Sequence, residues 1–212
     1  MLRIRTLGGL AVFDGERPLT GAAQQPKRLA LLAMLARAGS RGVSRDRLLL
    51  MFWPDADEER GRRGLNQALY ALRQELGEAA IMGSADLRLD PTLVTSDLQQ
   101  FDDARASGQP EAAAALWGGP FLDGFGLPGF PEFERWVETE RAALTHEYAE
   151  LLEALATAAR GRGEAVAAVG WWRKLAALDT HNARVAESLM RALAAAGDAP
   201  GALRHAEIFN TL

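Results

Sequence analysis

The stretch GRRGLNQALYALRQELG, residues 61–77, has two distinct faces when it is wound as an α-helix. At ~100° per residue, its four leucines occupy an arc of roughly 60°; they are Leu65, Leu69, Leu72 and Leu76. The opposite side, within about 140°, is called the polar face below and consists of Arg62, Arg63, Asn66, Gln67, Tyr70, Arg73 and Gln74. The polar face carries no carboxylate, whereas solvated helix faces usually mix Glu with Lys and Arg. A phosphate backbone would be repelled by acid, so the absence of acid fits a helix that binds nucleic acid.

Extended segments flank this region on both sides. Residues 3–13 alternate as a strand does, with a bulge or kink at Gly8-Gly9, and Asp14-Gly15 indicates a hairpin turn. Short extended pieces within residues 79–97 predict a second hairpin. These segments place a small amount of β-structure before and after the helices.

Two more helices precede the one with the polar face. They are expected over residues 26–38 and 45–53, and Ser44 is a suitable N-cap for the second. Asp57 is expected to cap the third helix, after Pro54 has ended the second. Three helices followed by a hairpin describe a winged helix-turn-helix, in which the third helix enters the major groove of DNA. A chance charge bias on an ordinary amphipathic helix is the alternative, and the polar face alone does not decide between the two.

Two longer stretches resemble the Streptomyces antibiotic regulatory protein (SARP) family. The first is RLALLAMLARAGSRGVSRDRLLLMFWPDADEERGRRGLNQALYALRQELG, and the second is LWGGPFLDGFGLPGFPEFERWVETERAALTHEYAELLEALA. The resemblance implies a response-regulator-type winged helix over residues 1–97 and a bacterial transcriptional activator domain over residues 98–212. It also implies a transcription activator that binds promoter direct repeats and contacts RNA polymerase.

The residues expected to contact double-stranded DNA come from the polar face, the second helix and the hairpin. They are Arg45, Arg62, Arg63, Asn66, Gln67, Tyr70, Arg73 and Arg88. Asn and Gln can pair with adenine edges, and Arg can pair with guanine edges. Arg62 and Arg73 lie nearer one side of the polar face and are expected to hold phosphates. Arg45 is placed by the resemblance at the start of the second helix, and Arg88 is the only basic residue near the tip of the second hairpin.

The loop before the third helix is acidic. Glu58 and Glu59 stabilise the positive end of the helix dipole, whereas Asp55 precedes the cap and has no such role. In the fold that the resemblance implies, this loop faces away from the bases. Asp55 with Glu58 or Glu59 is therefore expected to contact RNA polymerase or its sigma factor. Phe52 and Trp53 are expected to anchor the loop in the core.

The second half of the chain contains a repeat. GEAVAAV at 163–169 recurs as GDAPGAL at 197–203, a spacing of 34 residues that is the period of tetratricopeptide helix pairs. The fold class expected is therefore mainly α, with an N-terminal winged helix-turn-helix (α+β) and then an all-α tetratricopeptide-like repeat domain. The chain ends inside what would be a further helix of the array, so truncation at the C-terminus is expected.

The Gly-, Pro- and Phe-rich stretch before that repeat contains five large aromatic residues. They are Phe121, Phe125, Phe130, Phe133 and Trp136. Large aromatics at helix junctions are usually buried, so they are expected to plug the helical core rather than form a binding patch.

Composition and motifs argue against several other functions. The chain has no cysteine, and its three histidines are scattered, so no metal or cofactor is expected. No nucleophile elbow or phosphate loop occurs, which argues against an enzyme. No apolar run is long enough to cross a bilayer and no signal peptide begins the chain, so a cytoplasmic protein without membrane contact is expected.

The charge distribution leaves two functions open. Residues 1–97 carry 14 Lys and Arg against 12 Asp and Glu, whereas residues 98–212 carry 10 against 16. This asymmetry favours a DNA-binding first half. The resemblance to the SARP family implies self-association of two copies on DNA. However, Ala71 stands where many SARP relatives carry a basic residue, and Asp86 lies at the tip of the second hairpin. A protein-interaction adaptor whose winged helix does not read DNA is therefore the alternative.

Overall fold

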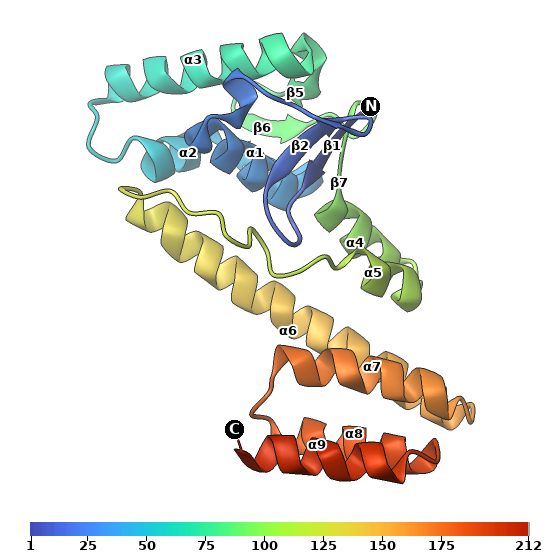
Figure 1. Cartoon of the computed structure of the whole chain (residues 1–212). Helices are drawn as coiled ribbons and strands as arrows, with labels where there is room; N and C mark the ends of the chain where they lie inside the picture. Colours follow the sequence, from blue (N-terminus) through green and yellow to red (C-terminus); the bar gives the residue numbers. More distant parts are fainter. Residues whose placement is uncertain (212) are drawn as a thin grey trace. The chain divides into compact units, whose positions relative to one another are not determined.

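The computed structural model describes residues 1–211, and the chain divides into two compact units (Figure 1). The first comprises residues 1–142, and the second begins at Ala143. None of the helices in the described part of the chain has both the length and the hydropathy that a bilayer crossing requires.

The first unit opens with a four-stranded sheet in the order β3-β2-β1-β7. Its strands are β1 (Leu2–Arg5), β2 (Ala11–Asp14), β3 (Arg17–Pro18) and β7 (Val94–Ser96). β1 is antiparallel to β2 and parallel to β7. The prediction of one kinked strand over residues 3–13 is wrong, because Gly8 (φ +83°) and Gly9 (φ +115°) adopt positive φ values and the chain reverses between β1 and β2. The predicted hairpin turn at Asp14-Gly15 is confirmed by the pairing of Asp14 with Arg17.

Three helices and a second sheet complete the winged helix-turn-helix. The helices are α1 (Pro26–Ala38), α2 (Arg45–Phe52) and α3 (Glu58–Leu76), and short 3₁₀ turns lie at Ala22–Gln24, Gly39–Arg41 and Glu78–Ala80. Both predicted N-caps are confirmed: Ser44 Oγ accepts from Arg47 N at 3.2 Å, and Asp57 Oδ1 accepts from Arg60 N at 2.8 Å. The second sheet, in the order β4-β6-β5, contains β4 (Val43–Ser44), β5 (Ile81–Met82) and β6 (Asp86–Leu89). The β5–β6 hairpin is the predicted wing.

The core of the winged helix explains the direction in which α3 faces. All four leucines of its apolar arc are at most 7% exposed. They share the core with Leu48 and Phe52 of α2 and with the leucines of α1. Because this side is buried, the polar face of α3 is turned toward solvent.

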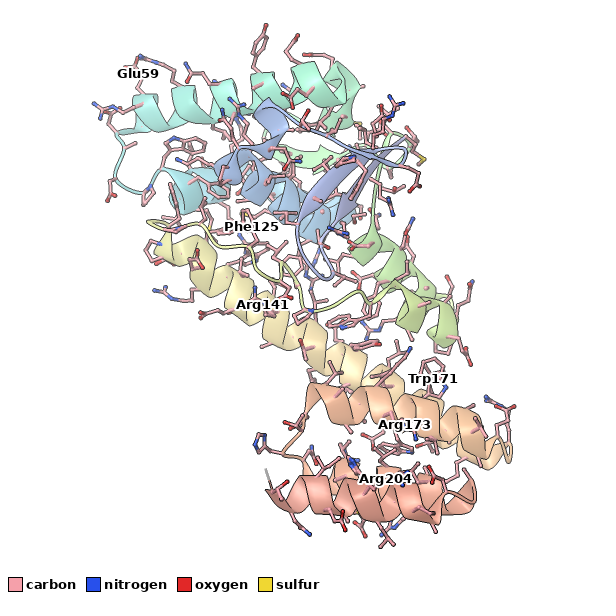
Figure 2. The ribbon with its side chains drawn as sticks, viewed as in Figure 1. Glu59, Phe125, Arg141, Trp171, Arg173 and Arg204 are labelled. Carbon is pink, nitrogen blue, oxygen red and sulfur yellow. The ribbon has the colours of Figure 1, made fainter. Side chains whose placement is uncertain are left out.

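The rest of the first unit consists of α4 (Asp97–Ala106), α5 (Pro110–Leu116), a loop and the beginning of α6 (Pro131–Gly161). The loop lies against the β1–β2 connection. Gly8 N donates to Pro120 O at 3.1 Å, and Leu122 N donates to Thr6 O at 2.8 Å. Arg141 of α6, labelled in Figure 2, holds the same loop by donating to Phe121 O at 2.9 Å and to Leu122 O at 3.0 Å.

The aromatic residues of this segment pack around one another and around α2. Phe121 and Phe133 are fully buried, as the plug prediction requires, whereas Phe125, Phe130 and Trp136 are half-buried. Phe133 lies 5.5 Å from Phe52 of α2 between ring centroids. The segment therefore joins α6 to the end of α2.

Gly8 provides a test of how closely the loop must approach the β1–β2 connection. A Cβ at Gly8 would lie 2.6 Å from Gly118 O, a backbone atom that cannot rotate away. We expect Gly8→Ala to reduce the free energy of unfolding by about 2–4 kcal/mol, because the alanine would have to adopt a positive φ and its Cβ would overlap the backbone of Gly118. Urea denaturation measures this loss. Gly15→Ala is the matched control, because Gly15 also has positive φ (+57°) but no atom within 4 Å of the added Cβ. Equal losses for the two variants would contradict the role of the close approach.

The second unit consists of the end of α6 with α7 (Ala165–Leu178), α8 (Ala183–Ala195) and α9 (Ala199–Thr211). Gly163 (φ +77°) and Gly197 (φ +83°) follow α6 and α8 at equivalent places, so the repeated sequences begin α7 and α9. α7 ends at Leu178 and α8 begins at Ala183, so a short connection that starts at Asp179 separates the two helices.

Candidate nucleic-acid interface

The polar face of α3 is open to solvent along most of its length. Arg62, Arg63, Asn66 and Gln67 are exposed, and Tyr70 is 66% exposed, which is unusual for so large a ring. These residues line a shallow hollow together with Arg28 of α1, Ala71 and Glu59. Figure 1 shows α3 at the outer edge of the first unit, and Figure 2 labels Glu59 near its N-terminal end. The structure therefore brings five of the eight expected DNA contacts into one surface.

Two of the exposed arginines are held by acids one turn earlier. Arg62 Nη2 lies 2.5 Å from Glu58 Oε1, and Arg63 Nη2 lies 2.6 Å from Glu59 Oε1. Exposed pairs of this kind contribute only about 0.3–0.5 kcal/mol, so a phosphate or a base edge can replace the carboxylate at little cost. The sequence analysis missed these pairs, although the i, i+4 spacing of Glu58 with Arg62 and of Glu59 with Arg63 could have revealed them.

Arg45 connects the start of α2 to the polar face. Its Nη2 donates to Asn66 Oδ1, and its backbone N donates to Ala85 O, in the wing turn, at 3.0 Å. The amide group of Asn66 is thereby oriented, and its remaining N–H groups are available to an acceptor. This contact between α2 and α3 spans 21 residues of sequence.

Arg73 and Arg88 lie outside the hollow. Arg73 is half-buried and donates to Ile81 O from Nε at 3.3 Å and from Nη2 at 3.0 Å, which ties α3 to strand β5. Arg88 is exposed on β6, close to the exposed Asp86. The wing therefore presents one basic side chain, Arg88, beside one acidic side chain, Asp86.

The loop between α2 and α3 is fixed at its beginning. Phe52 is buried, and the indole of Trp53 lies against Gly64 of α3. Lys27 Nζ donates to Phe52 O at 3.1 Å and lies 4.7 Å from the Trp53 ring centroid and 4.4 Å from that of Phe130. Burial lowers the pKa of the Lys27 ammonium below its ordinary value. The expected anchoring role of Phe52 and Trp53 is consistent with this packing.

Asp55 lies in the loop, whereas Glu58 and Glu59, which were expected to act with it, belong to the first turn of α3. Asp55 is exposed, and no ion pair to it occurs among residues 1–211. Glu58 and Glu59 are engaged by Arg62 and Arg63. The described part of the chain contains no group of three His, Cys, Asp or Glu side chains that could hold a metal ion.

Comparison with known proteins agrees with this architecture. A model of the bacterial transcriptional activator domain (BTAD) matches residues 91–208. No curated protein matches the sequence. Among solved structures, the chain is similar to Mycobacterium tuberculosis EmbR in complex with a low-affinity phosphopeptide, with a TM-score of 0.69 and 24% identity. The similarity covers 100% of this chain and 59% of that one, and it concerns the fold. The predicted fold class, a winged helix-turn-helix followed by a helical repeat domain, is confirmed.

Proposed function

Because the chain belongs to the family of the bacterial transcriptional activator domain, we propose that it is a sequence-specific DNA-binding regulator that activates transcription. The observation that carries the proposal is the exposed polar face of α3, which contains no acid and lies on a winged helix-turn-helix. In this function residues 1–97 bind DNA and residues 98–212 form the activator domain. Proteins of this family regulate transcription, and the proposal adds the direct contact with DNA.

The positions of the side chains support separate roles at the DNA. Arg63, Asn66, Gln67 and Tyr70 project from the middle of the exposed face and contact base edges or the phosphates beside them. Arg62 and Arg45 contact phosphates, and Arg45 also orients Asn66. Arg88, which is exposed on β6 of the wing, contacts the DNA backbone. Arg73 is proposed to share its guanidinium between Ile81 O and a phosphate, since it has donors in excess of the two in use.

A gel shift on genomic fragments at several salt concentrations tests the proposal. We expect two copies to occupy a direct repeat side by side, so that footprints at saturating protein cover two half-sites. The logarithm of the binding constant falls linearly with the logarithm of the salt concentration, and each phosphate contact makes this slope steeper by about one. Arg62→Gln should therefore make the slope shallower by about one for each bound copy. A protein-interaction adaptor would show neither a fixed site nor a steep slope. The acid at Asp86 favours that second function, and the same experiment decides between them.

The loop before α3 provides a separate prediction about activation. Asp55 is proposed to contact a basic surface of RNA polymerase or its sigma factor, together with Glu58 or Glu59. We expect Asp55→Ala and Glu58→Ala to reduce in vitro transcription several-fold while promoter binding changes little, because neither residue lines the hollow and the exposed Glu58–Arg62 pair is weak. Glu16→Ala, which removes an exposed acid from the β2–β3 turn, is the control and should activate fully. Full activation by both loop variants would remove the loop from the mechanism.

A further inference from the structure

The second unit contains a cavity between the end of α6, the first half of α7 and α8. Its volume is 240 Å³. Its floor is apolar: Trp172 is 5% exposed, Ala168 3% and Ala192 8%. Arg160 of α6 and Arg191 of α8 also line the cavity, and both are exposed. An apolar floor with two guanidinium groups at its edge is the arrangement of a site for a small amphipathic ligand.

The charge at the edge of the cavity is unbalanced. Among the described residues, none accepts a hydrogen bond from the Arg160 side chain or pairs with it. Arg191 pairs with Glu187 at 2.5 Å, but both side chains are more than half exposed, so the pair is weak and replaceable. The nearby Glu164 is bound by Arg162 at 2.8 Å and 3.0 Å. Ser188 donates its proton to Arg184 O, so the guanidinium groups are the available donors.

We propose that this cavity binds a ligand with an apolar body and a carboxylate: the body packs on Trp172 and the alanines, and Arg160 and Arg191 bind the carboxylate. Two arginines offer paired N–H donors that match a carboxylate, whereas a cation would be repelled. The apolar floor disfavours an inorganic anion or a sugar, whose polar groups would lose their hydration without replacement. At roughly 30 Å³ per water molecule, the volume corresponds to about eight heavy atoms.

Occupancy of this site would join α6 to α8 through one ligand. The site lies entirely in the second unit, outside the winged helix-turn-helix, so it goes beyond the proposed DNA-binding function. A ligand held there stabilises the arrangement of the helices that it contacts.

Isothermal titration calorimetry of the full chain with octanoate tests the proposal without DNA. We expect octanoate to bind and octan-1-ol, which has the same chain without the charge, to bind at least about tenfold more weakly. Arg160→Gln and Arg191→Gln should each weaken octanoate binding about tenfold or more, because each removes charge-assisted hydrogen bonds. Arg204→Gln is the matched control, since Arg204 is exposed on α9 and does not line the cavity (Figure 2). Circular dichroism verifies that the variants keep their helices.

A second carboxylic acid, tested in the same way, shows whether the natural carboxylate belongs to a small aliphatic acid or to the C-terminus of a peptide. N-acetylvaline, which is close to octanoate in size, presents the same chemistry as the end of a peptide, so tighter binding than octanoate would assign the site to a chain terminus. Binding of either acid with the arginine dependence above supports the proposal. Three results would overturn it: neither acid binds, octan-1-ol binds as well as octanoate, or both arginine variants bind as the parent does. None of these results bears on DNA binding, which the gel shift measures separately.

Discussion

Replacing Asp97 by alanine is expected to reduce the free energy of unfolding by about 3–5 kcal/mol, from the loss of several partly buried hydrogen bonds at about 1–3 kcal/mol each. Asp97 is the first residue of α4, and its carboxylate accepts from the backbone of the β1–β2 connection. Thr6 N lies 2.8 Å and 2.9 Å from its two oxygens, and Leu7 N lies 2.8 Å from Oδ2. The hydroxyl of Thr6 donates to Oδ1 at 2.8 Å.

The size of this effect follows from burial. Thr6 is 0% exposed and Leu7 1%, so their N–H groups have little access to water when the acceptor is lost. Urea denaturation of Asp97→Ala measures the loss. Asp103→Ala is the matched control, because Asp103 is an exposed acid on the same helix and should cost less than about 0.5 kcal/mol. If Asp97→Ala unfolded at the same urea concentration as the control, the carboxylate would not be what joins α4 to β1.

The second large effect is expected at the DNA. Asn66→Ala and Gln67→Ala should each weaken specific binding by about 1–3 kcal/mol, or roughly 5–150-fold, and relax the sequence preference at the base pair concerned. Arg62→Gln should weaken binding to all sequences alike, because a phosphate contact carries no sequence information. Competition gel shifts with specific and nonspecific duplexes separate the two kinds of loss.

Gln74→Ala is the control for these variants. Gln74 is exposed on the polar face of α3 but lies outside the hollow that contains Asn66 and Gln67, so its removal should leave binding unchanged. Asn66→Ala also releases Arg45, whose guanidinium donates to the Asn66 amide. Making Arg45→Ala both in the parent protein and in the Asn66→Ala variant therefore measures how much of the Asn66 effect passes through Arg45. Unchanged affinity and unchanged preference in both Asn66→Ala and Gln67→Ala would refute the assignment of α3 as the reading helix.

The parts of the fold that depend on nearby residues were predictable. Ser44 and Asp57 cap α2 and α3 because a side-chain oxygen meets a backbone N–H three residues later, which sequence spacing alone specifies. The leucine arc of α3 determines which side is buried, and hence that the polar face is exposed. The candidate site was predictable to the same extent: Arg62, Arg63, Asn66, Gln67 and Tyr70 share one surface because they share one helix.

The sequence by itself thus determined the helices, their caps and the composition of the polar face, since each depends on residues within about one or two helical turns. Only the tertiary structure decided which charged groups face solvent. Arg73 donates to Ile81 O, Lys27 lies between two aromatic rings, and Asp97 binds Thr6 and Leu7 across 90 residues or more of sequence. Similarly, the need for glycine at position 8 arises from Gly118 O, 2.6 Å from where a Cβ would lie. Most of these partners are distant along the chain, and Arg73 and Ile81, eight residues apart, lie in different elements, so no periodic pattern records the contacts. The partners meet because burial of the apolar surfaces brings their segments together, and buried polar groups must then find acceptors and donors where packing has placed them.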